Sequence, residues 1–255
     1  MLYPKARACD SWGLMSAPRT RILSSPADVA EKALEYVLSR ADRAIAGGND
    51  FRIALSGGTT PRLLYERLSV ETRVAWSSWQ IFFGDERCVG PEHASSNYRM
   101  ANEALLSRVP LPGANVHRIQ GELAPELAAE RYEAELGDQP LELVLLGMGD
   151  DGHTASLFPG RPELLELSRR VVPALAPVAP ERRVTLTFRA LAEARAVLLL
   201  VTGASKAPRV AQVMSELQAE RPSLPAARVR PKSGVLEWYL DQAAAAAISS
   251  TAGLE

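Results

Sequence analysis

Residues 143–160 read LVLLGMGDDGHTASLFPG, and this stretch decides how the rest of the sequence is interpreted. The apolar run at its start has the composition of a buried strand. It leads directly into a turn that contains three glycines, two aspartates and a histidine, after which apolar residues resume. Such a turn costs free energy, because glycine loses the most backbone freedom on folding and adjacent carboxylates repel each other. We therefore expect either a cofactor loop or a place of acid–base chemistry.

Short apolar runs alternate with helical patterns on both sides of this stretch. The predicted strands lie at 21–25, 51–55, 79–83, 116–119, 141–147, 184–188 and 196–203. The predicted helices lie at 26–46, 62–68, 96–109, 122–137, 205–219 and 235–247, and 173–183 is interpreted as a proline-rich surface connection. The alternation predicts an α/β fold with a mainly parallel, Rossmann-like sheet flanked by helices on both faces. We expect one domain over residues 18–255, preceded by a loose extension over residues 1–17.

Composition excludes several classes of function. Lys and Arg number 29 against 30 Asp and Glu, so no global charge favours nucleic acid or an acidic membrane. No apolar run approaches the ~18 residues of a membrane span. Cys9 and Cys88 lack a CxxC spacing and are expected to be free thiols in a reducing cytoplasm. The three histidines stand singly, which argues against a structural zinc site.

Four predicted strands are each followed by a polar or glycine-rich segment. These segments are SGGTTP (56–61), GDERCV (84–89), GMGDDGH (147–153) and TGASK (202–206). Parallel α/β sheets bind ligands beyond the carboxyl ends of their strands. We therefore expect the four segments to converge on one pocket.

The first segment has the features of an anion-binding turn. Gly57 and Gly58 leave backbone N–H groups unobstructed, and the helix that follows adds the positive end of its dipole. Thr60 is the expected N-cap and Pro61 fits the first helical turn. The alternative is a tight turn without a ligand, and no GK[ST] follows that would make it a Walker loop. Lys206 would add a point charge beside a phosphate, or else is a solvated lysine.

Asp85, Arg87 and Asn97 are further candidates. The Arg87 guanidinium suits a phosphate or a carbonyl oxygen, whereas the alternative is a surface ion pair with Asp85. Asn97 would donate a hydrogen bond to sugar hydroxyls, or merely starts its helix.

Gly147, Gly149 and Gly152 satisfy a G-x-G-x-x-G pattern after a strand. A dinucleotide is disfavoured, because Asp150 and Asp151 would repel its pyrophosphate and no acidic residue ends a second strand ~20 residues later. A metal site built from these adjacent residues is also disfavoured.

The acid–base interpretation fits the same turn better. We expect His153 to begin a helix over TASLF, and an imidazole can act as a base near neutral pH. An aspartate, which we assign as Asp151, would fix its tautomer. The alternative is a helix-capping histidine without chemistry.

Together these segments resemble a known family. SGGTTPRLLYERL, FFGDERCV with SSNYRMANEALL, LVLLGMGDDGHTASLFPG and VLLLVTGASKA are similar, in order, to the motifs of 6-phosphogluconolactonases, in the glucosamine/galactosamine-6-phosphate isomerase superfamily. The resemblance covers roughly residues 20–245. It implies hydrolysis of 6-phospho-D-glucono-1,5-lactone to 6-phosphogluconate in the oxidative pentose phosphate pathway. It also implies a cytoplasmic enzyme without metal or cofactor, and we favour a monomer.

On this resemblance each candidate receives a role. His153 would take a proton from water, with Asp151 orienting it, and Arg87 or backbone N–H groups would stabilise the oxyanion. The choice of cation for each oxygen, Lys206 or Arg87, stays open. The predicted substrate-binding residues are Gly57, Gly58, Thr59, Asp85, Asn97 and Lys206.

Two alternatives are kept. Glucosamine-6-phosphate deaminases resemble the phosphate turn and the GxDGH pattern, but they follow the histidine with an FNEP-like stretch that supplies a glutamate. Here that stretch reads Ser156-Leu157-Phe158-Pro159. A non-catalytic sugar-phosphate sensor would share the fold, usually beside a DNA-binding module, and the sequence contains no basic helix-turn-helix region.

Overall fold

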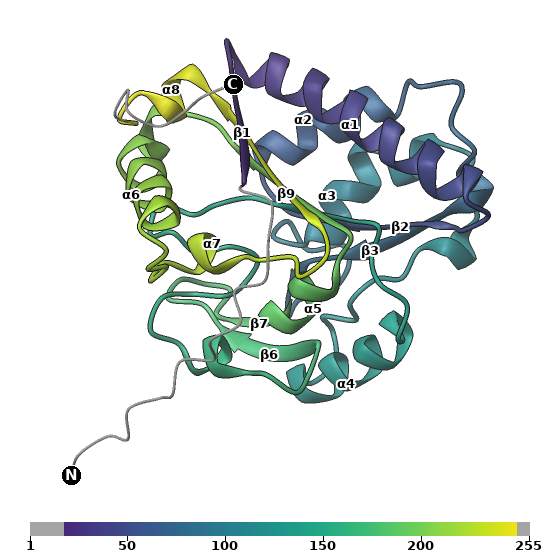
Figure 1. Cartoon of the computed structure of the whole chain (residues 1–255). Helices are drawn as coiled ribbons and strands as arrows, with labels where there is room; N and C mark the ends of the chain where they lie inside the picture. The colour runs from purple at the N-terminus through teal and green to yellow at the C-terminus, as the bar shows by residue number, and fades with distance from the viewer. Residues whose placement is uncertain (1–17, 249–255) are drawn as a thin grey trace.

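A six-stranded parallel sheet forms the centre of the computed structural model, which describes residues 18–248 (Figure 1). Its strand order is β1-β9-β8-β5-β2-β3, and all neighbours run parallel. The strands are β1 (Arg19–Leu23), β2 (Phe51–Leu55), β3 (Trp79–Phe83), β5 (Leu143–Leu146), β8 (Ala196–Val201) and β9 (Val235–Asp241). The predicted class, a mainly parallel sheet with helices on both faces, is confirmed.

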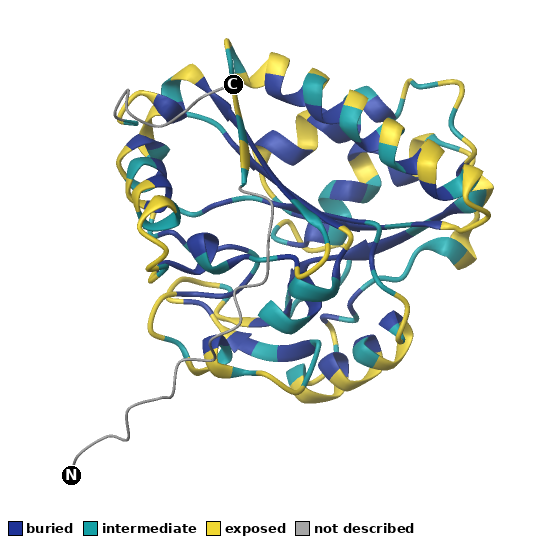
Figure 2. Ribbon diagram, viewed as in Figure 1, coloured by how far each residue is buried: buried dark blue, intermediate teal, exposed yellow. Residues whose placement is uncertain are grey.

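Helices cover the sheet on its two sides. Figure 1 shows α1 (Pro26–Ala46), α2 (Thr59–Leu68) and α3 (Asn97–Ala104) on one side. On the other side lie α6 (Ala207–Gln218), α7 (Pro225–Arg228) and α8 (Gln242–Ala245). Figure 2 shows the inner strands of the sheet as almost continuously buried, whereas the edge strand β1 and the outward faces of the helices are exposed or half-buried. The core therefore occupies both faces of the sheet, as a parallel sheet requires.

Helix α1 has the bounds that the sequence predicted. The Ser25 side chain accepts a hydrogen bond from the Asp28 N–H at 3.2 Å, and Pro26 stands in the first turn. Val29, Ala33 and Val37 are fully buried at helical spacing. The helix therefore forms because its cap and its apolar stripe agree.

The chain order places a crevice at the carboxyl end of the sheet. β2 pairs with β3 on one side and with β5 on the other. The chain therefore runs from β2 toward one edge of the sheet and from β5, through β8 and β9, toward the other, so the switch point lies between β2 and β5. Ligands of open α/β sheets bind at such a switch point. The segments that follow β2, β5 and β8 all lie at this edge.

A second sheet of three antiparallel strands stands beside the crevice. Its order is β4 (Asp85–Arg87), β7 (Arg182–Leu186), β6 (Val171–Leu175). The prediction of a surface connection over 173–183 was therefore wrong at both ends. The sequence shows little sign of this sheet, because β4 is short and charged and because β6 contains Pro173, which an edge strand tolerates. Helices α4 (Pro125–Leu136) and α5 (Phe188–Glu193) flank this sheet.

The prediction of a closing helix over 235–247 was also wrong. Residues Val235–Asp241 form β9, and only Gln242–Ala245 are helical. β9 lies between β8 and β1 and is buried from Leu236 onward, so pairing on both sides fixes it as a strand. The alanines, which have the highest helix propensity, begin only after it, at Ala243. The strand predicted at 116–119 is reduced to a single bridge between Val116 and Ile81.

The stretch after His153 forms turns instead of the expected helix. A bridge joins Thr154 to Leu157, and Ala155 has a φ of 48°. His153 therefore begins no helix, and the interpretation as a capping histidine does not hold.

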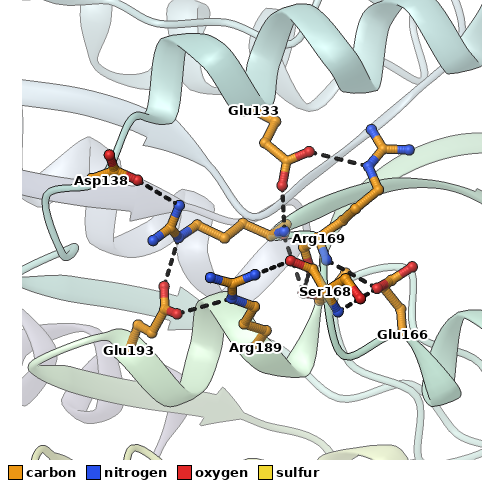
Figure 3. A network of polar contacts seen from close by, with 9 residues as sticks. Glu133, Asp138, Glu166, Ser168, Arg169, Arg189 and Glu193 are labelled. Carbon is orange, nitrogen blue, oxygen red and sulfur yellow. Dashed lines mark hydrogen bonds and ion pairs between the residues drawn. The ribbon is translucent and has the colours of Figure 1, made fainter.

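Ion pairs lock the chain as it enters β6, as Figure 3 shows. The Glu133 carboxylate of α4 accepts from the Arg170 N–H at 2.5 Å and from the Arg169 Nε at 3.1 Å. Glu193 of α5 accepts from the Nε atoms of Arg170 and Arg189 at 2.6 and 3.0 Å. The small sheet is thereby tied to both of its flanking helices.

Some predictions concern residues beyond the described range. The extension over residues 1–17 and Cys9 lie outside 18–248, and the single domain over 18–255 stays a prediction. Between residues 18 and 248, none of the helices is long and apolar enough to cross a membrane.

The corrected position of Trp238 leads to a stability prediction. Its side chain is fully buried in β9, so Trp238→Ala is expected to lower the free energy of unfolding by about 3–5 kcal/mol. Leu167, which is 81% exposed, is the control, and Leu167→Ala is expected to change it by less than about 0.5 kcal/mol. Urea titration of both variants measures the difference. Equal effects would contradict the placement of β9.

Candidate active site

A cavity of about 300 Å³ opens at the carboxyl ends of β2, β5 and β8. It is formed by the segments that follow these strands, together with residues of β4 and α3. The predicted site residues that line it are Gly57, Gly58, Thr59, Asp85, Arg87, Asn97, His153 and Lys206. Asp151 does not line the cavity but contacts His153. The expectation that four segments converge on one pocket is met by these positions.

Asp151 fixes the orientation of the His153 ring. Its Oδ1 lies 2.5 Å from the ring Nδ1 and also accepts the His153 backbone N–H at 3.0 Å. Burial raises the pKa of Asp151, but the hydrogen bonds and charge of His153 outweigh this, so its pKa falls below the usual range. The carboxylate is therefore an ionised acceptor for Nδ1–H, which leaves Nε2 as the ring nitrogen that can act as a base.

Two neighbours confine the His153 ring. The Phe158 ring packs against it, with ring centroids 4.3 Å apart. A Cβ on Gly149 would come within 2.0 Å of the His153 Cε1 and 2.1 Å of its Nδ1. Position 149 must therefore be glycine for the ring to lie where it does. This glycine of the G-x-G-x-x-G pattern serves the histidine, and the sequence interpretation did not identify that reason.

The Gly57–Gly58 turn begins helix α2. Gly58 is the N-cap, with a φ of 110° that disfavours other residues. A Cβ on Gly57 would come within 2.0 Å of the Asn97 Oδ1, so the turn and α3 need a glycine to meet. The prediction of Thr60 as N-cap was wrong, because the N-cap is Gly58, two residues earlier. The Thr60 hydroxyl instead lies 2.7 Å from that of Thr202, across the cavity lining.

Asp85 is held by side chains from two other segments. Its Oδ2 accepts from the Ser156 Oγ at 2.6 Å, and its Oδ1 accepts from the Asn97 Nδ2 at 3.2 Å. Asp85 is only 7% exposed. Arg87 does not pair with it and donates to the Ser95 carbonyl. The alternative of an Asp85–Arg87 surface ion pair was therefore wrong. Ser156 was missed as a site residue, since nothing in the sequence pairs it with Asp85.

Glu86 organises the start of α3 from the opposite face of β4. Its buried carboxylate accepts the backbone N–H groups of Asn97 and Tyr98, each at 2.7 Å, and the Ser96 Oγ at 2.9 Å. Burial raises the pKa of Glu86, although these hydrogen bonds oppose the rise. The contact fixes where Asn97 stands. The contacts join Glu86 to residues 10, 11 and 12 positions away, so sequence spacing gave no signal for them.

Lys206 ties two of the site segments together. Its Nζ lies 2.7 Å from the Asp150 carboxylate, and its side chain is 24% exposed. The turn that carries it is anchored by Asp241, whose carboxylate oxygens accept the Gly203 N–H at 3.0 and 3.1 Å. Lys206 is thus a fixed cation at the cavity wall and not a freely solvated side chain.

The described residues 18–248 contain no cluster of three or more His, Cys, Asp or Glu side chains that could hold a metal ion. Cys88 is not activated as a nucleophile. Burial, and next the charge of Glu86, raise the pKa of its thiol to about 11. A thiol of this pKa remains protonated at neutral pH.

Comparisons with known proteins agree with this geometry. Residues 24–238 match the model of the family described as glucosamine-6-phosphate isomerases/6-phosphogluconolactonase. A 6-phosphogluconolactonase of Synechocystis is 40% identical over 238 residues, which cover 89% of this chain and 97% of that protein. A rice protein named probable 6-phosphogluconolactonase 3, chloroplastic, is 38% identical over 241 residues, which cover 87% of this chain and 73% of that protein.

A solved structure extends the likeness to three dimensions. The crystal structure of 6-phosphogluconolactonase from Thermotoga maritima superimposes with a TM-score of 0.78 at 31% identity, covering 88% of this chain and 99% of that one. The chain belongs to the family of glucosamine-6-phosphate isomerases and 6-phosphogluconolactonases, and within it to the 6-phosphogluconolactonases.

Proposed function

We propose that this chain hydrolyses 6-phospho-D-glucono-1,5-lactone to 6-phospho-D-gluconate, with His153 as the general base. The observation that carries the proposal is the Asp151–His153 contact of 2.5 Å at the wall of the cavity that the Gly57–Gly58 turn also lines. The same cavity thus offers a base and backbone donors for an anion. A sugar phosphate with a reactive C1 is a substrate that needs both.

The phosphate is assigned to the start of α2. Thr59 is the first residue of α2, and Gly57 and Gly58 directly precede it. Their backbone N–H groups can bind an anion, and the helix dipole adds positive potential there. Lys206 lies at the cavity wall and supplies a further charge. Asp85 and Asn97 also line the cavity and are assigned to the sugar hydroxyls.

The chemistry follows from the orientation of His153. Because Asp151 holds the proton on Nδ1, the unprotonated Nε2 takes a proton from a water molecule as its oxygen attacks C1 of the lactone. Arg87 or backbone N–H groups stabilise the oxyanion that forms. When the bond from C1 to the ring oxygen breaks, the imidazolium returns the proton to that oxygen. The products are a carboxylic acid, which ionises, and a free hydroxyl group.

The deaminase alternative is less well supported. The stretch that would supply its glutamate is Ser156–Pro159 here, and it contains no carboxylate. Ser156 donates to Asp85, and Phe158 packs on His153. A cytoplasmic location stays a prediction, since the similar rice protein is named as chloroplastic.

The direct test of the proposal is an NMR time course with fresh 6-phosphogluconolactone. Such lactones also hydrolyse without an enzyme, so the rate must exceed that of a blank without protein. We expect 6-phosphogluconate to form faster with the protein, and no ammonia to be released from glucosamine-6-phosphate. Hydrolysis no faster than the blank would end the proposal, and steady ammonia release would favour the deaminase.

Replacement of His153 tests the role of the base. His153→Ala is expected to lower kcat by about 10²–10⁴-fold, because general base catalysis contributes about that much. The affinity for phosphate is expected to stay the same, since the phosphate contacts are elsewhere. His117 is the matched control, because its ring stacks on Phe82 outside the cavity and His117→Ala leaves the site intact. A fully active His153→Ala protein would refute the assignment.

Replacement of Gly149 tests the position of the ring without removing it. Gly149→Ala is expected to displace the imidazole and to lower kcat by about 10²-fold, as a misplacement of about 1 Å can do. Gly113→Ala is the control, since a Cβ there would meet nothing within 4 Å. Rates at saturating lactone, with unfolding midpoints for both variants, make the comparison. Equal activity of the two variants would show that the ring position does not matter.

A further inference from the structure

The small sheet presents two arginines side by side on one of its faces. Arg87 of β4 stands directly opposite Arg183 of β7 in the antiparallel register. Residues that oppose each other share a face, and so do residues two apart in one strand. Asp85 and its partner Thr185 therefore belong to the same face, while Glu86 and Val184 lie on the other.

This shared face is the one turned toward the cavity. Asp85 and Arg87 line the cavity, and Ser156 of the segment after β5 bonds to both the Asp85 carboxylate and the Thr185 hydroxyl. Arg183 lies one strand further from the cavity and does not line it. Arg183 is only 6% exposed, so it is buried in the protein beside Arg87, its partner in the register.

Neither guanidinium has an acidic partner among the ion pairs between residues 18 and 248. Arg87 donates to the Ser95 carbonyl, and its Nε is buried without a hydrogen bond. The Arg183 Nε donates to the Pro180 carbonyl at 2.6 Å. Asp85 is the nearest acid on this face, but its oxygens accept from Ser156 and Asn97. Each of the two guanidinium groups thus has one backbone carbonyl as its hydrogen-bond partner, Ser95 for Arg87 and Pro180 for Arg183.

Such a pair is unfavourable by itself. An arginine stays charged at any working pH, and like charges at close range in a low-dielectric setting repel each other. Burial lowers the pKa of Arg183, and the charge of Arg87 lowers it further; the charges of Asp85 and Glu86 oppose this but do not outweigh it. Burying an unpaired charge is tolerated where a function needs it. An anion bound at Arg87 would relieve both costs.

We propose that Arg183 is a positioning residue for an oxyanion of the substrate. Arg87 makes the contact, and Arg183 behind it supplies a second positive charge and keeps the Arg87 guanidinium directed to the cavity. The inference rests on the proposed function for the identity of the anion. That anion is either the phosphate or the carboxylate that hydrolysis creates at C1, and the two share the chemistry that a guanidinium recognises.

A pair of variants separates charge from structure. Arg183→Gln removes the charge and Arg183→Lys retains it, while both keep a donor for the Pro180 carbonyl. Arg182→Gln is the matched control, since Arg182 is the exposed neighbour in the same strand. Binding of inorganic phosphate, gluconate and 6-phosphogluconate is measured by NMR titration, and unfolding midpoints are recorded for each variant.

Arg183→Gln is expected to weaken 6-phosphogluconate binding about tenfold without lowering the unfolding midpoint, because one of two repelling charges is gone. Arg183→Lys is expected to restore most of the affinity, and Arg182→Gln to change nothing. A loss confined to phosphate assigns the pair to the phosphate, and a loss confined to gluconate assigns it to the C1 end. If Arg183→Gln does not fold, Arg183→Met replaces it as the neutral variant.

Unchanged affinity in Arg183→Gln, or a lower midpoint with unchanged affinity, would overturn the inference, since either result assigns Arg183 to the fold alone. Failure of Arg183→Lys to restore binding would overturn it too. The proposed function fails separately. A protein that binds 6-phosphogluconate through Arg183 but does not accelerate lactone hydrolysis would retain this inference and lose the catalytic one.

Discussion

A strand that is buried on both faces keeps a charged side chain away from water, so a charge there needs a partner, as Glu237 of β9 has in Arg19 and Arg21. β5 and β8 meet this condition along their whole length, and every one of their residues is apolar. In β5 and β8, polar groups therefore appear only where the strand ends. Because the strands run parallel, their carboxyl ends share one edge of the sheet, and the groups that the core excludes are collected there. The placement of His153, Lys206 and the Gly57–Gly58 turn around one cavity is a consequence of this exclusion.

Acidic side chains hold these segments in shape. Asp151 accepts from the backbone and the ring of His153, Glu86 accepts from the first N–H groups of α3, and Asp241 accepts from Gly203. Each carboxylate accepts backbone N–H groups that lack a regular backbone partner, in the turns of His153 and Gly203 and at the start of α3. In this molecule several acids near the cavity therefore serve as scaffold, while the proposed proton transfer is assigned to the imidazole that one of them orients.

The parts that sequence could predict are those in which local pattern and tertiary setting agree. The bounds predicted for 26–46, 51–55 and 79–83 are those of α1, β2 and β3. Prediction failed where the two disagree. β9 carries helix-forming residues but lies between two strands, and β4 is three charged residues that gain their strand form from β7.

The same distinction applies to the candidate site. Residues that follow strands, such as Gly57 and His153, could be named from position alone. Ser156 and Glu86 could not, because their partners come from other segments and are fixed only by folding. The contact between Gly149 and the His153 ring belongs to this second kind, since a glycine pattern in a sequence does not say which side chain needs the space.

The edge of the large sheet joins the two ends of the described chain. The register pairs Arg19 with Glu237 and Leu23 with Asp241, and β9 is also the neighbour of β8. During synthesis on the ribosome, β1 emerges before every other strand of the large sheet, and its partner β9 emerges after all of them. Until then β8 has an uncovered apolar edge, which is the kind of surface that favours aggregation during folding. The large sheet is thus completed only after β9 has emerged, and the interval before that is when a chaperone would have the most apolar surface to protect.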